Sequence, residues 1–327
     1  MDVMTIGIDI AKNMFQVHGV DADEQVVVRR QLRRSQVIAF FKKLSPCLVG
    51  MEACATSHHW ARELQELGHD VRLMPPAYVK PYVKRNKNDA ADAAAICEAV
   101  TRLSMRFVAV KSEEQQGALM LHRTRELLIR QRTMLVNAIR GHMAEFGIVA
   151  GQGPANAKTL LAVIADAGDA RLPPDARTCL RRLAIQVTSI DKEIAEASQH
   201  IQHHFRSNPV SRRLETIPGI GPVIATAISA SVTDPAIFQS GRGLAAWIGL
   251  VPREMSTGGK RRLGRISKQG DPYLRWLMVT GAMSVIRQAK RRGTSNLPWL
   301  DRLIASKPTK VAAVALANKM ARIAWVL

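Results

Sequence analysis

The chain has 327 residues, which is enough for two domains that each bury a core of their own. It carries 47 Lys and Arg against 27 Asp and Glu, a formal net charge of +20, in an otherwise globular composition that excludes a disordered or collagen-like chain. A surface this basic predicts a polyanionic partner, and nucleic acid is favoured because neutralised phosphates release counterions. We find no uncharged apolar run of 18 residues and no signal peptide, so we expect a cytoplasmic protein with no membrane segment.

The basic excess is concentrated in the last third of the sequence. Residues 206–327 hold 20 Lys and Arg but only five Asp and Glu, so +15 of the net +20 lies there. This region is therefore the better candidate for the main polyanion contact. A soluble basic surface with no specific partner is the alternative that charge alone leaves open.

The first third of the chain alternates apolar strand patterns with short helical ones. We expect strands over residues 4–10, 15–21, 24–32, 46–51 and 69–74, and helices over 35–44, 57–67 and 88–101. Three strands come first, and helices then alternate with the last two. This element order is that of an α/β RNase H-like (RuvC-like) domain, which we place at residues 1–111.

Two long helices follow, and their apolar residues recur at coiled-coil spacing. Ser112 and Gln115 form a capping-box pattern at the start of the first helix. The apolar positions of the second helix alternate gaps of three and four, at Leu180, Leu183, Val187, Ile190, Ile194, Ala197 and Ile201. We therefore expect a coiled-coil helical region over residues 112–205. The pattern fits two helices that pack as a hairpin within one chain, and it equally fits helices that form the contact surface of a homo-oligomer.

Residues 206–327 form the third expected domain, which is mainly α-helical. Between two helical segments lies Ile-Pro-Gly-Ile-Gly-Pro, residues 217–222, a turn that resembles a helix-hairpin-helix. Backbone N–H groups at Gly219 and Gly221, followed by a helix N-terminus, suit contact with a DNA or RNA phosphate. A tight turn without a ligand is the alternative. Apolar helical spacing is still running at Leu327, which allows the natural chain to extend further.

Four acidic residues fall at particular places in the expected elements of the first domain. Asp9 lies in the first strand, and Glu52 directly follows the fourth. Asp89 and Asp92 share one face of the helix after the fifth strand. In an RNase H-like fold these places meet at one edge of the sheet. Converging carboxylates repel unless a cation lies between them, and Mg²⁺ is the hard ion that oxygen ligands suit, so we expect a catalytic metal site for phosphodiester chemistry.

A second candidate site lies in residues 253–270, which we expect to form a loop rich in glycine, serine and basic residues. Its six basic residues, the candidates for nucleic-acid contact, are Arg253, Lys260, Arg261, Arg262, Arg265 and Lys268. A serine among these charges could attack phosphorus and form a covalent phosphoserine, and Ser256, Thr257 and Ser267 supply the hydroxyls. No histidine lies nearby in sequence to act as the base, and composition alone favours a plain phosphate-binding loop.

Six motifs together resemble the DEDD transposases of the insertion-sequence-110 family, which are related to the Piv DNA invertases. They are GIDIAK around Asp9, GMEACAT around Glu52, NKNDAADA around Asp89 and Asp92, IPGIGP, AAWIGLVPRE, and MSTGGKRRLGRISKQGD. These motifs span nearly the whole chain in the family's order. The resemblance implies a RuvC-like domain, a coiled-coil insertion and a C-terminal transposase domain. It also implies a nucleophilic serine in the STGG stretch, where Ser256 is our choice and Thr257 the runner-up.

The resemblance further implies how such a protein would bind its metal and its partners. Asp9, Glu52, Asp89 and Asp92 would be the metal-binding quartet, with Mg²⁺ as the cofactor. A bridge RNA from the element would pair with donor and target DNA. The chain would act as a homo-oligomer, a dimer or a tetramer, in which the metal site of one protomer meets the serine of another.

Together these observations predict a transposase or recombinase of an insertion sequence, which exchanges DNA strands through a covalent phosphoserine. Two alternatives stay open. A RuvC-like structure-specific DNA endonuclease would use the same acids with water as the nucleophile. A non-catalytic nucleic-acid-binding protein would keep the fold without the chemistry, and the presence of all four acids argues against it.

Overall fold

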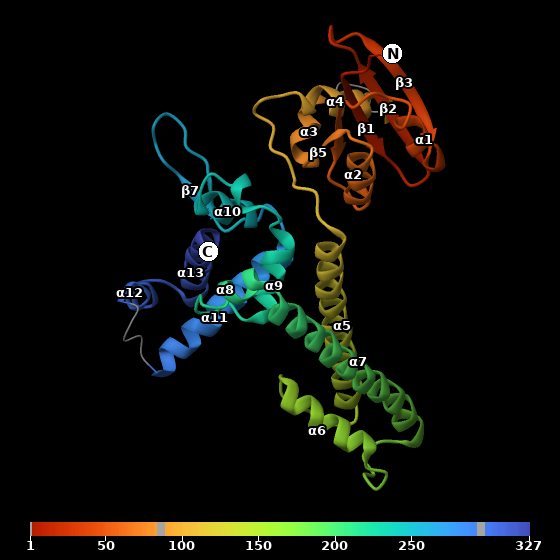
Figure 1. Ribbon diagram of the computed structural model, residues 1–327. Coiled ribbons are helices and arrows are strands. Elements are labelled where there is room, and N and C mark those ends of the chain that lie inside the picture. The colour runs from red at the N-terminus through yellow and green to blue at the C-terminus, as the bar shows by residue number, and fades with distance from the viewer. Residues whose placement is uncertain (1, 84–88, 293–297) are drawn as a thin grey trace. The chain divides into compact units, whose positions relative to one another are not determined.

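The computed structural model describes residues 2–83, 89–292 and 298–327 (Figure 1). The chain forms two compact units, Met1–Glu113 and Glu114–Leu327. The finer division into residues 1–111, 112–205 and 206–327 stays a prediction. Among the described residues, no helix combines the length and the apolar character that crossing a bilayer requires.

The first unit is built on a five-stranded mixed sheet with the spatial order β3-β2-β1-β4-β5. Its strands are β1 (Thr5–Ile10), β2 (Met14–Val20), β3 (Val26–Arg33), β4 (Leu48–Glu52) and β5 (Asp70–Met74). The first three strands pair antiparallel, whereas β4 pairs parallel with both β1 and β5. All five predicted strands are confirmed, because apolar runs bounded by turns are strong strand signals.

Helices pack on both faces of this sheet. They are α1 (Val37–Phe41), α2 (Ser57–Glu66), α3 (Pro76–Val79) and α4 (Asp89–Val100), with 3₁₀ turns at Arg34–Gln36 and Lys80–Tyr82. The neighbouring residues Leu73 and Met74 of β5 belong to different apolar clusters, one with α1 and α2 and the other with α3 and α4. The helix predicted over 35–44 is shorter than expected, because its start is a 3₁₀ turn. α3 lies outside the predicted elements, since Pro75-Pro76 indicated a stop.

The closest approach between α4 and the sheet occurs over glycines. A Cβ atom on Gly7 of β1 would lie 2.2 Å from the Ala93 carbonyl oxygen and 2.3 Å from the Cys97 amide nitrogen. On Gly50 of β4, which pairs with Gly7, it would lie 2.7 Å from Cβ of Val100. The backbone of α4 therefore rests directly on β1, and a side chain at Gly7 would force the two apart.

The second unit is mainly helical. Its helices are α5 (Glu113–Ala144), α6 (Pro154–Ala165), α7 (Pro174–Ser207), α8 (Pro209–Leu214), α9 (Pro222–Ser231), α10 (Gly241–Ile248), α11 (Pro272–Arg292), α12 (Pro298–Ser306) and α13 (Thr309–Val326). A 3₁₀ turn spans Pro235–Ile237, and a hairpin of β6 (Pro252–Glu254) and β7 (Leu263–Ile266) separates α10 from α11. Buried residues of α8 to α13 and of the end of α7 share one apolar core.

The long helices α5 and α7 run antiparallel within the same chain. Arg125 Nε donates to Ser198 Oγ at 2.9 Å, and one heptad along α5 the Nε atom of Arg132 lies 2.5 Å from Asp191 Oδ1. All seven predicted seam positions of α7 are buried or half-buried. Of the two alternatives, this pairing agrees with a hairpin within one chain. A role of the two helices in oligomers stays a prediction. α6 lies outside the predicted elements, since glycine and proline breaks bracket it.

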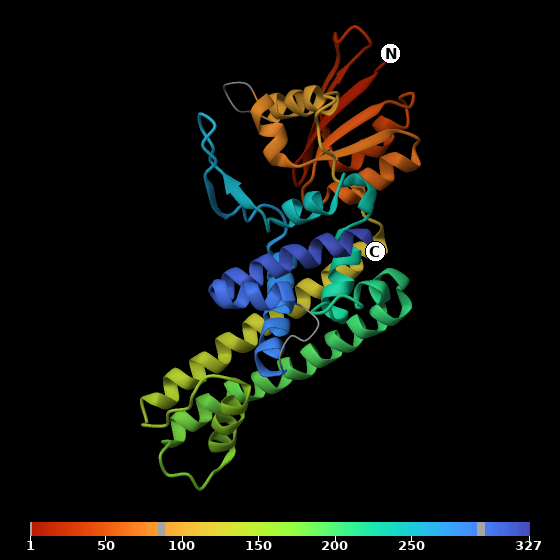
Figure 2. The ribbon, with the colours of Figure 1, turned by 90° about the vertical axis from the view of Figure 1, so that its left-hand side faces the viewer.

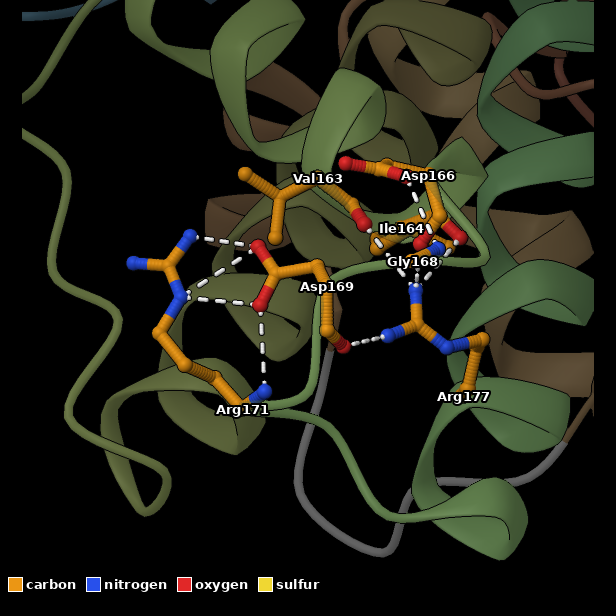
Figure 3. Close-up of polar contacts among 7 residues, drawn as sticks. All are labelled: Val163, Ile164, Asp166, Gly168, Asp169, Arg171 and Arg177. Carbon is orange, nitrogen blue, oxygen red and sulfur yellow. Dashed lines mark hydrogen bonds and ion pairs between the residues drawn. The ribbon is translucent and has the colours of Figure 1, made fainter.

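Arg177 in the first turn of α7 caps the C-terminal end of α6 (Figure 3). Its guanidinium donates to the carbonyl oxygens of Val163 at 3.1 Å and Ile164 at 3.4 Å. It also donates to the carbonyl oxygens of Asp166 and Asp169. The last carbonyls of a helix lack intrahelical donors and carry partial negative charge, so this buried arginine both satisfies and neutralises them.

We expect Arg177→Ala to destabilise the second unit by about 2 kcal/mol, because hydrogen bonds from a buried charged donor are lost. For a unit of this size, that loss corresponds to a fall of about 4–8 °C in the thermal unfolding of the full chain. Arg171→Ala is the matched control, since Arg171 binds only the more exposed side of the same loop through the Asp169 carboxylate. Equal melting temperatures for the two variants would contradict the capping role.

His122 of α5 is buried and joins three helices of the second unit. Its Nε2 lies 3.0 Å from Thr226 Oγ1 on α9, and its Nδ1 lies 3.1 Å from the Tyr273 hydroxyl on α11. Thr226 Oγ1 donates to the Pro222 carbonyl at 2.7 Å, so it accepts from Nε2–H, and Nδ1 accepts from the Tyr273 hydroxyl. These bonds fit the neutral ring, and burial lowers the pKa of His122 to about 4.

The lowered pKa of His122 predicts a pH dependence of stability. The unfolded ring gains its proton near pH 6.5 and the folded ring only near pH 4, so stability is intact above pH 6.5 and falls from there towards pH 4. His122→Gln should therefore show a smaller loss of stability between pH 7 and 5 than the unchanged chain in urea unfolding. His142→Gln, at an exposed site on the same helix, is the control. Unchanged pH dependence in His122→Gln would refute this assignment.

Candidate active site

Three of the four predicted acids lie close together beside β1, the central strand of the sheet in the first unit. One carboxylate oxygen from each of Asp9, Asp89 and Asp92 lies within 4.8 Å of the other two. Asp9 comes from β1, and the other two come from the first turn of α4. Asp9 stands two residues after Gly7, hence on the face of β1 that α4 covers. The close contact at Gly7 thereby sets how near the carboxylates of strand and helix lie.

Glu52 lies on the neighbouring strand, on the same side of the sheet. It ends β4 two residues after Gly50, and the pairing of Met51 with Ile8 brings it beside Asp9. Among the described residues it is not in the group of oxygens within 4.8 Å, so its role as fourth ligand stays a prediction. A glycine two positions before the acid, in Gly-Ile-Asp and Gly-Met-Glu, is the signal that could have revealed both close contacts.

The clustered carboxylates suit a hard divalent cation. Each offers an oxygen ligand, and three negative charges this close repel one another unless a cation lies among them. Asp9 and Asp92 are half-buried and Asp89 is exposed, so the cluster is accessible to a phosphate from solvent. The donor set fits Mg²⁺, and Mn²⁺ shares the same preference for oxygen.

Residues 253–270, predicted as a loop, form the β6–β7 hairpin and its flanks instead (Figures 1 and 2). Thr257 pairs with Lys260, and between them Gly258 has φ 57° and Gly259 has φ 75°. Positive φ at both central positions is typical of a type I′ turn, which matches the twist of the strands that it joins. Residues 255–262 and 267–270 lie outside the strands, as expected of a loop. Residues 253–254 and 263–266 are strand instead, which apolar alternation does not mark because the strands are short and exposed.

Ser256 lies just before this turn, and its hydroxyl is held from two sides. Its Oγ donates to Glu254 Oε1 at 2.9 Å and accepts from the Arg262 backbone N–H at 3.3 Å. Arg261 Nε lies 3.5 Å from the same glutamate oxygen. The sequence alone did not indicate Glu254, because its hydrogen bond to Ser256 depends on how the backbone continues beyond the end of β6.

The base of the hairpin is fixed to the helices that flank it. A Cβ atom on Gly249 would lie 2.2 Å from the Gln269 carbonyl oxygen, and one on Gly270 would lie 1.8 Å from that of Trp247. Arg275 Nη1 of α11 also donates to the Gln269 carbonyl, at 2.9 Å. The two ends of the hairpin are therefore packed backbone to backbone, which limits their movement.

All six predicted basic contacts are exposed on the hairpin or its flanks, at Arg253, Lys260, Arg261, Arg262, Arg265 and Lys268. Arg253 Nη2 also donates to the Ser267 carbonyl at 3.2 Å, which ties the two strands together. Exposed cations near a hydroxyl fit the binding of a phosphate. Their contact with nucleic acid stays a prediction.

The predicted glycine turn lies between α8 and α9. A Cβ atom on Gly219 (φ 90°) would lie 2.9 Å from the Gly281 carbonyl oxygen of α11, so helix packing alone requires this glycine. A Cβ atom on Gly221 would meet nothing within 4 Å, which leaves room for a ligand there. Contact of either glycine with a nucleic-acid backbone stays a prediction.

Known families match parts of both units. The family described as Transposase IS116/IS110/IS902 family matches residues 211–296, and a second transposase family, named for IS110 DEDD transposases, matches residues 6–148. A probable family 20 transposase of Pseudomonas aeruginosa is 50% identical over 328 residues, which cover 100% of this chain and 97% of the relative.

Two relatives from named elements are similar along the whole chain. The transposase for insertion sequence element IS1328 of Yersinia enterocolitica is 39% identical over 100% of this chain and 97% of the relative. The transposase for insertion sequence element IS1111A of Coxiella burnetii is 38% identical over 100% of this chain and 90% of the relative. With full-length identity of this degree and family matches in both units, the chain belongs to the IS110/IS116/IS902 family of insertion-sequence transposases.

Proposed function

We propose that this transposase cuts and rejoins DNA by transesterification, with the acid cluster and Ser256 acting on one phosphodiester. The observation that carries the proposal is the meeting of three carboxylates from β1 and α4 within 4.8 Å. The strand order and mixed pairing of the first unit support an RNase H-like (RuvC-like) fold. The hairpin supports the choice of Ser256 over Thr257, because polar contacts orient the Ser256 hydroxyl.

Each group has a distinct role in this mechanism. Asp9, Glu52, Asp89 and Asp92 would hold Mg²⁺, which when bound offsets the charge that builds on a scissile phosphate. Ser256 Oγ forms a bond to phosphorus while the bond to the departing 3′ oxygen breaks, and a phosphoserine results. The 3′-hydroxyl of the exchanged strand then attacks that phosphorus and frees Ser256. Every step replaces one phosphate ester by another, so ATP is not required.

Donor and target DNA are the substrates in this proposal, and the basic residues of the hairpin bind their phosphates. The charge of +15 over residues 206–327 supports polyanion binding by this region. Following the family resemblance, a bridge RNA selects both DNA sites. The chain then acts in the cytoplasm as a homo-oligomer, in which the acid cluster of one protomer meets Ser256 of another.

If the acids bind a metal, a variant that lacks one of the carboxylates should bind divalent ions more weakly. We expect Asp92→Asn to weaken Mg²⁺ or Mn²⁺ binding at least about tenfold, because even outer-shell changes weaken metal binding about 10- to 100-fold. Isothermal titration measures the affinity, and cleavage of labelled DNA should fall in parallel. Glu98→Gln is the control, since Glu98 lies on the same helix but pairs with Arg102. Full-strength binding by Asp92→Asn would rule out this metal site.

The nucleophile role predicts a covalent protein–DNA adduct. We would incubate the chain with the element's RNA, Mg²⁺ and labelled donor and target DNA, and separate the products on a denaturing protein gel. Ser256→Ala should abolish the adduct, because no hydroxyl replaces the lost one at that position. Thr257→Val, which keeps the shape of the neighbouring side chain, should form it normally.

The same gel separates the alternatives. An adduct formed by Ser256→Ala but not by Thr257→Val would identify Thr257 as the nucleophile. Free cleaved DNA without adduct, unchanged in Ser256→Ala, would replace this mechanism by a water-using endonuclease. Mapping the modified peptide by mass spectrometry identifies the attacking residue in the unchanged chain.

A further inference from the structure

The carboxylate of Glu254 is the group closest to the hydroxyl that the proposed function makes a nucleophile. Ser256 Oγ donates to Glu254 Oε1 at 2.9 Å, which is an ordinary hydrogen bond between a hydroxyl and a carboxylate. The bond joins the last residue of β6 to a residue two positions further on, and the Met255 N–H holds the backbone between them by donating to the Arg262 carbonyl at 2.9 Å. The Arg262 backbone N–H occupies another side of the same hydroxyl at 3.3 Å.

The hairpin and its flanks offer no second carboxylate as a proton acceptor. Glu254 is the sole acidic residue in residues 253–270, and the remaining charged residues there are cations, namely Arg253, Lys260, Arg261, Arg262, Arg265 and Lys268. Guanidinium groups stay protonated in proteins, so the arginines cannot act as the base. The histidines of the second unit lie on α5 and α7, and no histidine lies in the hairpin.

We propose that Glu254 is the general base that activates Ser256, an inference that rests on the proposed phosphoserine mechanism. As the bond from Ser256 Oγ to phosphorus forms, the Oγ–H proton passes to Glu254 Oε1. The bond from phosphorus to the 3′ oxygen breaks, and that oxygen takes a proton from solvent water. The products are a phosphoserine, a 3′-hydroxyl, a neutral Glu254 carboxylic acid and a hydroxide ion, which the buffer neutralises.

Charge favours this transfer at the moment of attack. A carboxylate close to an arriving phosphate repels it, and the accepted proton removes that repulsion as the new ester forms. Arg261 Nε lies 3.5 Å from Glu254 Oε1, so a cation stands beside both the glutamate and the position of the phosphate. In the rejoining step the 3′-hydroxyl of the exchanged strand attacks phosphorus and gives its proton to solvent water. The bond from phosphorus to Ser256 Oγ breaks, and Oγ takes the proton of the Glu254 acid. One residue thus serves cleavage and rejoining.

Glu254→Gln is the matched test, because the amide keeps an oxygen that accepts the Ser256 hydrogen bond but cannot take the proton. The rate of adduct formation would be followed on denaturing gels from pH 5 to 8.5, with the full chain, RNA, Mg²⁺ and DNA. We expect Glu254→Gln to form adduct about 10²- to 10⁴-fold more slowly at pH 7.5. The ratio of the two rates should shrink as pH rises, because hydroxide then replaces the base that Glu254→Gln lacks.

The ratio isolates Glu254, since every other effect of pH on the reaction acts on both proteins. Glu215→Gln, an exposed change elsewhere in the second unit, should leave the rate unchanged, and thermal unfolding checks that each variant folds. A slow Glu254→Gln variant whose rate ratio is constant across pH would make Glu254 a positioning residue and overturn the base role. Equal rates overturn it as well. Adduct absent from the unchanged chain would overturn the proposed function and the base together, whereas an adduct unaffected by Glu254→Gln overturns the base alone.

Discussion

The packing of the α4 backbone onto β1 at Gly7 is the contact on which the acid site depends. It allows a helix to approach a strand more closely than any side chain permits, and it fixes Asp92 opposite Asp9. Asp89 and Asp92 also stand in the first turn of α4, where the partial positive charge of the helix N-terminus offsets some of their mutual repulsion. The packing of α4 on β1 thus brings three carboxylates together, and the N-terminus of α4 offsets part of their repulsion.

The second unit separates its stabilising contacts from its reactive ones. Buried polar groups such as His122 and Arg177 connect helices, and each has its hydrogen bonds satisfied inside the protein. The hydroxyl of Ser256, by contrast, lies exposed at the end of a two-stranded hairpin whose base is packed tightly at Gly249 and Gly270. Because the base of the hairpin is fixed and its tip is exposed, Ser256 is accessible to a large substrate without local unfolding of the protein.

Apolar periodicity was sufficient to predict the five strands, the helix that carries Asp89 and Asp92, and the seam of α7. It was insufficient for α6 and α12, which proline and glycine breaks separate from their neighbours, and for the hairpin, whose residues are exposed on both faces. The contact of Glu254 with Ser256 was not predicted, because it depends on the backbone between the end of β6 and the turn. The nearness of Glu52 to the other acids depends on its side-chain conformation, which no spacing rule reports.

The acid cluster also sets an order of events during synthesis. Its members come from the first strand and the last helix of the first unit, so the parallel β1–β4 and β4–β5 pairings and the docking of α4 must all precede it. Such long-range pairing is slow to form, and a chain still on the ribosome holds no assembled cluster until the whole unit has emerged. Ser256 is made later still. A single chain therefore carries both halves of the proposed chemistry only after Ser256 has been made.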